Sequence, residues 1–118
     1  MPRKKPGPYE TLWRLALALP GVEEGTSYGT PAFKVGGKLI ARLKEDGESL
    51  VILIDFDERE RLMRADPATF YITDHYLNYP SILVRLPKVR AKALRDLLEK
   101  AWRRAAPPRM VEAFDGKP

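Results

Sequence analysis

The sequence has no cysteine and only one histidine, and these two shortages exclude several kinds of active site. Without cysteine, the chain can form no disulfide, thiolate nucleophile or cysteine-ligated zinc centre. His75 follows Asp74, and such a pair can serve acid–base chemistry. However, no serine lies in a recognisable nucleophile motif, and no carboxylates cluster around His75 to complete a metal site. We therefore expect a binding protein rather than an enzyme, with no metal and with His75 in a structural or ligand-contacting role.

Long apolar runs and cofactor motifs are missing as well. The longest apolar runs, Leu15–Leu19 and Leu50–Ile54, have five residues, whereas a membrane-spanning helix needs about 20. No apolar signal segment follows the basic residues at the start of the sequence. The glycines at Gly29 and Gly36–Gly37 fit neither a P-loop nor a dinucleotide-binding fingerprint. We therefore expect a cytosolic protein without a membrane segment and without a cofactor.

The apolar pattern and the turn residues predict a single α+β domain over residues 9–118, preceded by a flexible basic tail over residues 1–8. Helices are expected at Tyr9–Leu19, near residues 58–64 and at Lys88–Ala105. Strands are expected at residues 32–35, 38–43, 49–54, 70–73 and 81–86, between polar or glycine-rich turns. Short turns favour antiparallel pairing. We therefore predict an antiparallel sheet of about five strands with the helices packed on one of its faces.

The expected C-terminal helix combines an apolar stripe with the largest basic block of the chain. Its stripe, expected to be buried against the sheet, consists of Leu94, Leu97, Leu98, Ala101 and Trp102. The net charge of +5 is concentrated in residues 1–5 and 88–110, while the middle of the chain is mildly acidic. This asymmetry suits an anionic partner such as nucleic acid, although charge alone favours a merely solubilising surface. The alternating charges of Glu58–Arg61 are likewise interpreted as a solvated helix face.

The first predicted hairpin turns at Gly36–Gly37 and carries the strongest sequence indication of a binding surface. A two-residue turn places Phe33, Lys38 and Arg42 on one face and Lys34 on the other. If Phe33 points outward, it lies between two cations and can stack on a base. If Phe33 belongs to the core, Lys34 projects outward instead. The usual burial of apolar aromatic side chains favours the second arrangement.

Four segments of the sequence resemble the MmcQ/YjbR family. They are Leu17–Glu24, Tyr28–Lys38, Tyr79–Ser81 at the entry to a strand, and Ala101–Pro107 at the end of the long helix. The resemblance implies a frataxin-like fold, in which the N- and C-terminal helices pack on one face of a twisted antiparallel sheet. It also implies the DNA-binding role that is often assigned to the family through a proposed double-wing arrangement of its hairpins.

Two departures from the family pattern limit what the resemblance implies. Ile82 or Leu83 stands where many relatives have a tryptophan, so an aromatic stacking role at that strand does not carry over. The first helix has Glu10 as its only acid, so the acidic ridge that binds iron in true frataxins is absent from it. Iron handling is therefore not implied.

The resulting prediction is a small binding domain that contacts DNA weakly and largely without sequence preference. The residues expected to bind nucleic acid are Lys34, Lys38, Arg42, Arg104 and Arg109, and those expected to line or stack on a ligand are Tyr28, Phe33, His75 and Tyr79. The alternative is a protein–protein interaction or regulatory module that uses the loop Tyr76–Pro80 and the glycine–proline segment as an apolar patch. A third possibility is a small-molecule binder or enzyme that uses His75.

Overall fold

The computed structural model describes residues 8–116 of the chain. The predicted tail over residues 1–8 therefore lies outside the described residues, except for Pro8, which begins the first helix. In chain order the elements are α1 (Pro8–Leu17), β1 (Val22–Ser27), β2 (Thr30–Val35), β3 (Lys38–Leu43), β4 (Ser49–Leu53), α2 (Phe56–Ala65), β5 (Phe70–Tyr71), the 3-10 turn η1 (Asp74–Tyr76), β6 (Ser81–Arg85), α3 (Ala91–Ala105) and α4 (Pro108–Phe114). None of the helices within residues 8–116 has the length and apolar character needed to cross a membrane.

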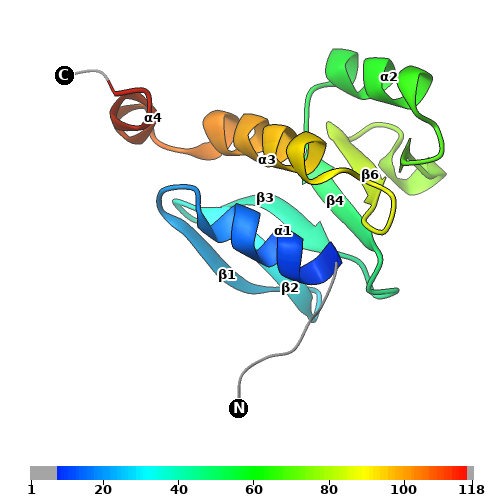
Figure 1. The fold of residues 1–118 in the computed structure, drawn as a ribbon, viewed down its shortest axis with the longest axis horizontal. Helices are drawn as coiled ribbons and strands as arrows, with labels where there is room; N and C mark the ends of the chain where they lie inside the picture. Colours follow the sequence, from blue (N-terminus) through cyan, green and yellow to red (C-terminus); the bar gives the residue numbers. More distant parts are fainter. Residues whose placement is uncertain (1–7, 117–118) are drawn as a thin grey trace.

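The strands form one antiparallel sheet of six strands in the order β1-β2-β3-β4-β6-β5. Helices α1 and α3 pack side by side against one face of this sheet (Figure 1). The predicted α+β class, with terminal helices on one face of an antiparallel sheet, is therefore confirmed. The sheet has one strand more than expected, because β1 was not predicted.

Strand β1 escaped prediction because its sequence lacks the apolar alternation that marks a half-buried strand. Val22 is its only large apolar residue, and Glu23, Glu24, Gly25 and Thr26 are all exposed. It forms the edge of the sheet and pairs with β2 along its whole length. Its position is thus fixed by pairing with β2 and by the hydrogen bonds that Glu24 accepts from Tyr9 and Trp13 of α1, rather than by burial of its own side chains.

The helix-covered face of the sheet holds the main core. From α3 it receives the predicted stripe, Leu94, Leu97, Leu98, Ala101 and Trp102, whose burial is confirmed. From α1 it receives Leu12 and Ala16, both fully buried. The indole Nε1 of Trp102 donates a hydrogen bond of 2.8 Å to the carbonyl of Pro20. This bond ties α3 to the segment that follows α1, so the two helices are linked by both packing and hydrogen bonding.

A bulge in the β2–β3 hairpin changes which side chains share a face. Next to the turn, Lys34 pairs with Leu39 as expected, but Phe33 pairs with Ala41, so Ile40 is the extra residue. Phe33 is fully buried in the core, which confirms the arrangement favoured by its apolar character. Arg42 does not share the face of Phe33, contrary to expectation. Because Ile40 is inserted, the alternation of side chains between the two faces shifts by one residue after it, and Arg42 lies on the face opposite Phe33.

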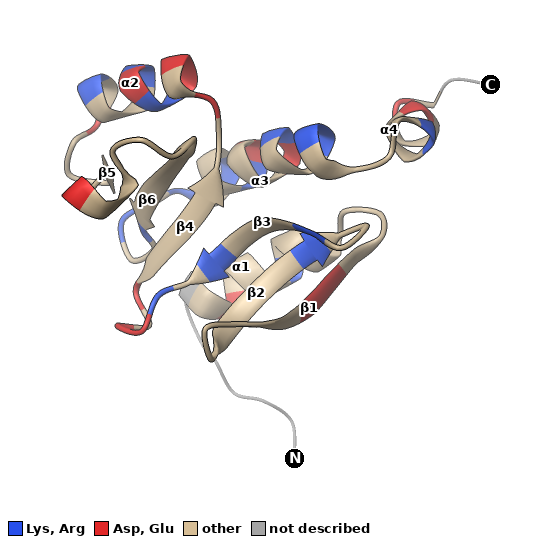
Figure 2. Ribbon diagram, turned by 180° about the vertical axis from the view of Figure 1, so that it is seen from behind, with Lys and Arg blue, Asp and Glu red and all other residues tan. Residues whose placement is uncertain are grey.

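The second face of the sheet is only partly covered. Here Tyr76 packs on Val51 and Leu83, with Tyr71 and Ile72 around them, in a small separate cluster. This covering comes from the segment between β5 and β6, which includes η1. Figure 2, seen from behind, shows this face of the strands in front of α1 and α3. The part of the face formed by β3 and the end of β4 has no helix over it, and we call it the open face.

Candidate functional site

The open face holds a pocket of about 590 Å³ between the β1–β2 turn and residues 74–81, which begin with η1 and which we call the η1 segment. Its floor is apolar and consists of Leu39, Val51 and Leu53, from the middle strands β3 and β4. Its walls carry four rings and three polar groups, namely Tyr28, His75, Tyr76, Tyr79, Arg42, Glu45 and Ser81. A volume of this size lies within the range of small-molecule pockets, and an apolar floor with a few polar groups is their usual composition.

Tyr28 forms one wall from an unusual backbone position. It has φ of 55° and is followed by Gly29 at φ 80°, so both central residues of the β1–β2 turn are left-handed. Asparagine or glycine normally occupies such a position, because the left-handed conformation is costly for other L-residues. The side chain of Tyr28 is nevertheless 85% exposed, and its ring centroid lies 5.1 Å from the Arg42 guanidinium carbon. The turn therefore holds a large ring in solvent at the rim of the pocket.

Arg42 is held in place beneath that ring. Its Nη1 donates hydrogen bonds to Thr30 Oγ1 at 3.0 Å and to the Leu43 carbonyl at 3.3 Å. The carboxylate of Glu45 lies 4.0 Å from the same nitrogen. These contacts fix the guanidinium at the pocket wall, but Glu45 also neutralises part of its charge.

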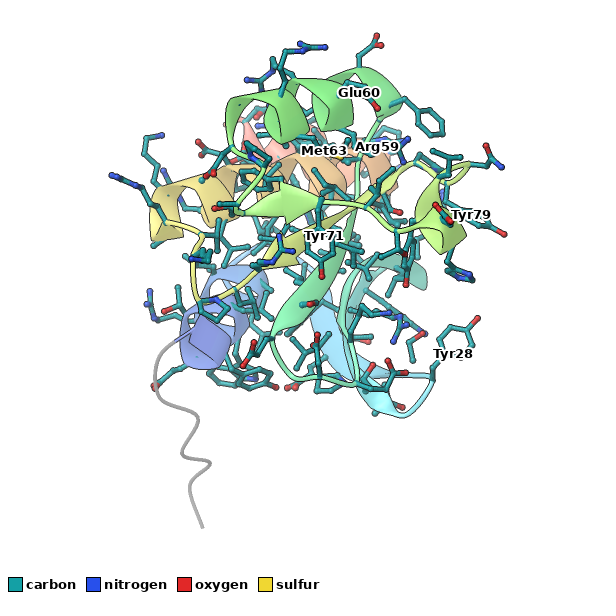
Figure 3. The ribbon with its side chains drawn as sticks, turned by 90° about the vertical axis from the view of Figure 1, so that its right-hand side faces the viewer. Tyr28, Arg59, Glu60, Met63, Tyr71 and Tyr79 are labelled. Atoms are coloured by element: carbon teal, nitrogen blue, oxygen red, sulfur yellow. The ribbon has the colours of Figure 1, made fainter. Side chains whose placement is uncertain are left out.

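The opposite wall is formed by aromatic residues of the η1 segment. The rings of His75 and Tyr76 meet edge to face with centroids 4.8 Å apart, and Tyr79 lies 6.1 Å from His75. The ammonium of Lys44, from the end of β3, lies 5.4 Å from the Tyr76 ring centroid. In Figure 3, Tyr28 and Tyr79 project on the same side of the molecule, from the two walls of the pocket.

Arg59, on α2, holds the η1 segment in position. It is only 3% exposed and points its guanidinium at the backbone of the segment (Figure 3). Nη1 donates to the carbonyls of Tyr76 (3.1 Å), Tyr79 (2.9 Å) and Ser81 (3.3 Å), and Nη2 donates to that of Leu77 (3.0 Å). The interpretation of this stretch of α2 as a solvated face is therefore wrong for Arg59. Its guanidinium thus joins four carbonyls of this irregular stretch of backbone to α2.

Ser81 provides a buried polar group in the pocket wall. It pairs with Leu53 across β4 and β6, so both side chains lie on the open face. Ser81 is 2% exposed, and its Oγ finds no hydrogen-bond partner within residues 8–116. Buried hydroxyl groups nearly always have a partner, so an exception calls for a functional or structural reason.

A second pocket of about 370 Å³ adjoins the first and shares Leu39 and Leu53 with it. Lys38 from β3 and Arg104 from α3 both line it, although they are far apart in the sequence. Neither forms an ion pair with any residue that the structure describes. The second pocket also takes in Ala101 and Ala105 of α3, and Lys38 pairs with Val35 of the covered face, so this pocket extends from the open face towards the helix-covered side. The two pockets together form a groove, which we call the open-face groove, with aromatic rings at one end and, at the end next to α3, two cations that have no ion-pair partner among the described residues.

Most other cations of α3 are engaged elsewhere. Lys92 and Arg103 each form an ion pair with an acid on α3 itself, at 3.2 and 3.0 Å. Lys100 reaches Glu58 on α2 at 2.8 Å, and this hydrogen bond is the main reason that the pKa of Glu58 lies below its ordinary value. Arg104 is thus distinguished from its neighbours on the helix by its position at the groove.

The structure brings six of the nine predicted site residues to the groove. Tyr28, Arg42, His75 and Tyr79 line the first pocket, and Lys38 and Arg104 line the second. Lys34 lies on the open face beside Leu39 but lines neither pocket. Arg109 lies on α4, away from both, and Phe33 is buried in the core, so neither contributes to the groove. Among residues 8–116 no three of His, Cys, Asp and Glu gather into a group that could hold a metal ion.

Sequence reasoning missed Arg59 and Ser81, the two buried polar groups of the site. Arg59 was hidden by neighbouring charges of both signs, which are typical of a solvated helix. Ser81 was noticed only as part of the Tyr79–Ser81 resemblance. Its orientation follows from the start of β6, where alternation places it beside Leu53 and opposite the buried Ile82.

Comparison with known proteins adds a family and a fold. A family model described as YjbR matches residues 17–104. The uncharacterised proteins Rv2570 of Mycobacterium tuberculosis and Mb2600 of Mycobacterium bovis are each 29% identical over 73 residues, which cover 62% of this chain. The chain spans about half the length of these curated relatives, 49% in each case. The crystal structure of protein DR2400 of Deinococcus radiodurans, a DUF419 domain, superposes with a TM-score of 0.68 at 24% identity, covering 80% of this chain and 75% of that one.

Proposed function

The chain belongs to the YjbR family, and from that premise we propose that it is a small nucleic-acid-binding protein that holds DNA weakly through its phosphates. The observation that carries the proposal is the open-face groove, where Lys38 and Arg104 are unpaired within the described residues and lie next to a pocket lined with aromatic rings. Cations that track a phosphate backbone beside exposed rings are the usual combination in proteins that bind nucleic acid without sequence preference.

The arrangement of charge supports phosphate contacts at this face. Figure 2 shows Lys and Arg segments on the β2–β3 hairpin and acidic segments on β1 and in the β3–β4 turn, whereas α2 and α3 each carry both signs. The apolar stripe of α3 packs against the sheet, so this helix presents no free apolar face. On the exposed side of α3, three of the five cations pair with acids, so the helix shows no clear pattern for reading bases, and direct reading of base pairs is not expected.

The test is fluorescence anisotropy with a labelled DNA across a salt series, on full-length protein. Arg3, Lys4 and Lys5 are replaced by Ser in all samples, because these three cations could bind any polyanion by themselves. Each phosphate contact releases counterions and contributes about −0.9 to the log–log slope of affinity against salt, so three to five contacts give a slope of about −3 to −5. Binding should be measurable at micromolar protein and about 50 mM salt.

A matched pair of double variants separates the groove from general charge. Replacing Lys38 and Arg104 by Ala should weaken binding to all sequences alike and make the slope shallower by about 2. Replacing Lys92 and Arg95 by Ala removes the same charge from another part of the surface, where Lys92 already pairs with an acid, and should have a smaller effect. Equal losses in the two variants, or no binding by the parent protein, would refute the proposal.

A protein partner is the second candidate, and one observation favours it. Leu77 and Tyr79 are more than half exposed, and Phe56 on α2 is exposed beside Arg59, whose guanidinium lies 4.7 Å from its ring centroid. Exposed apolar residues grouped around one loop are a common feature of protein interaction sites. If the DNA measurements fail, this apolar group becomes the leading surface, and replacing Leu77 by Asp is the variant that tests it.

A further inference from the structure

The larger pocket of the open-face groove has a shape and lining that suit one flat, polar group. We infer that it receives a single unpaired nucleobase, so that the protein prefers single strands to duplexes. This inference rests on the proposed function and narrows it. Phosphate contacts alone would give no preference for single strands over duplexes. It is carried by three features of the pocket: its two exposed tyrosines, its buried unpaired hydroxyl and its weak net charge.

The exposed tyrosines supply the stacking surfaces. Tyr28 and Tyr79 are 85% and 57% exposed and stand on the two walls of the pocket (Figure 3). His75 and Tyr76 add two further rings behind Tyr79. Aromatic side chains of this kind stack on any base, because every base has a π face. The left-handed backbone of Tyr28 strengthens the argument, since strain that is retained at an exposed side chain indicates a use for that side chain.

The floor of the pocket distinguishes a nucleobase from a purely apolar ring. Leu39, Val51 and Leu53 form an apolar surface, and Ser81 lines the same pocket with a hydroxyl that is buried and has no hydrogen-bond partner in the described residues. A base entering the pocket would place its flat body on the leucines and valine and would present donors and acceptors at its edge to the hydroxyl. A serine hydroxyl can donate or accept, so it can pair with the edge of any base.

The charges assign base and phosphate to different parts of the groove. In the larger pocket Arg42 lies 4.0 Å from Glu45, so the positive charge there is partly cancelled. The adjoining pocket holds Lys38 and Arg104, which have no acidic partner among residues 8–116. The shared residues Leu39 and Leu53 place the two pockets next to each other. A nucleotide with its base in the larger pocket and its phosphate in the adjoining pocket would place the neutral ring in the nearly neutral site and the negative charge beside Lys38 and Arg104. A base inside a duplex is stacked and paired, and it could enter only after being flipped out at an energetic cost.

Three labelled DNA probes and full-length protein with Arg3, Lys4 and Lys5 replaced by Ser provide the test. The probes are a single strand of about 12 nucleotides, its duplex, and a strand of equal length whose central positions are abasic. We expect the single strand to bind at least about tenfold more tightly than the abasic strand, and more tightly than the duplex in spite of the duplex's higher charge. Similar affinities for all three probes, with the salt dependence retained, would overturn the base pocket while leaving phosphate binding intact. If no probe binds, both the base pocket and the phosphate binding are refuted.

Ser81→Ala is the informative variant, because Ser81 Oγ has no described partner to lose and the protein should keep its melting temperature. It should reduce affinity for the single strand by about threefold to tenfold and leave the abasic strand unaffected. Thr26→Ala, which removes an exposed hydroxyl on β1, is the matched control. It should change neither the affinity for the single strand nor the affinity for the abasic strand. An unchanged single-strand affinity in Ser81→Ala would contradict the assigned role of the hydroxyl.

Adenosine monophosphate serves as a fourth probe, followed by NMR of the tyrosine rings. The strand inference requires it to bind far more weakly than the single strand, because it lacks the neighbouring phosphates. If it binds as tightly as the strand, the pocket is a site for a free nucleotide and the preference for single strands is wrong.

Discussion

On the face of the sheet that α1 and α3 cover, Ile52 and Ile82 are fully buried, whereas their neighbours Leu53 and Ser81 face the open-face groove. The two kinds of environment thus alternate along the same strands, because successive side chains of a strand point to opposite faces. The covered face contains aliphatic and aromatic side chains in close packing. The open face contains two half-buried leucines, Leu39 and Leu53, and a hydroxyl without a described partner. The aromatic pocket and the main core therefore lie on opposite sides of one sheet, whereas the cation Arg104 reaches the groove from α3, on the covered side.

The largest expected effect lies on the covered face. Leu97→Ala should lower the free energy of unfolding by about 2–5 kcal/mol, because it leaves a cavity among closely packed side chains. Leu53→Ala, on the open face, should cost only about 1 kcal/mol, since Leu53 is half-buried and water can fill the space. Urea denaturation of both variants gives the comparison. Equal losses would mean that the two faces do not differ in the way described.

An intermediate effect is expected at Arg59, which connects the covered side of the molecule to the open face. Arg59→Met keeps much of the packing but removes the donor to four carbonyls of the η1 segment. A hydrogen bond that involves a charged group contributes about 1.5–3 kcal/mol net, and bonds that share one donor group do not add, so a loss of roughly 2–3 kcal/mol is expected.

Amide hydrogen exchange locates the effect of Arg59→Met. Exchange should accelerate over residues 76–81 and remain slow in α3, because only the segment loses its donor. Arg61→Met is the control, since Arg61 is exposed and pairs with Glu58 at the surface; it should cost less than about 0.5 kcal/mol. Uniform acceleration throughout the sheet would show that Arg59 supports the whole fold rather than the groove wall.

The smallest effect, and the only one of opposite sign, is expected at Tyr28. The left-handed conformation costs most L-residues about 1–2 kcal/mol, and losing the contact with Arg42 removes about 0.5–1 kcal/mol. Tyr28→Asn should therefore leave the protein as stable as before or more stable by up to about 1 kcal/mol, while DNA binding weakens. Tyr79 does not have a positive φ, so Tyr79→Asn should not raise the melting temperature measured by thermal denaturation. Destabilisation of Tyr28→Asn by more than 1 kcal/mol would show that the tyrosine is present for structure.

The covered face was largely predictable from the sequence, because burial there follows simple periods. The stripe Leu94–Trp102 repeats at helical spacing, and each of its five predicted residues is buried. The turn at Gly36–Gly37 was also predictable, since both glycines adopt positive φ. Phe33 was assigned to the core on its apolar character alone. Regular patterns of this kind need no knowledge of distant contacts.

The open face was less predictable, because its geometry depends on contacts between distant parts of the chain. The bulge at Ile40 has no clear local signal, yet it moves Arg42 to the opposite face from Phe33. The burial of Arg59 depends on carbonyls 17 to 22 residues away. Residue type did indicate Tyr28, His75 and Tyr79 as lining groups, but their grouping around Ser81 arises only when β6 pairs with β4.

The acidic edge strand β1 has a consequence for how copies of this protein behave at high concentration. An exposed edge offers unpaired backbone groups that can recruit another strand and start aggregation. On β1, Glu23 and Glu24 place negative charge along this edge, and Gly25 interrupts it with a residue of low β propensity. Edge-to-edge association of two copies would bring their exposed Glu23 carboxylates close to each other, while Glu24 is held towards α1 by hydrogen bonds from Tyr9 and Trp13. The composition that hides β1 from sequence analysis therefore also makes it a poor template for self-assembly.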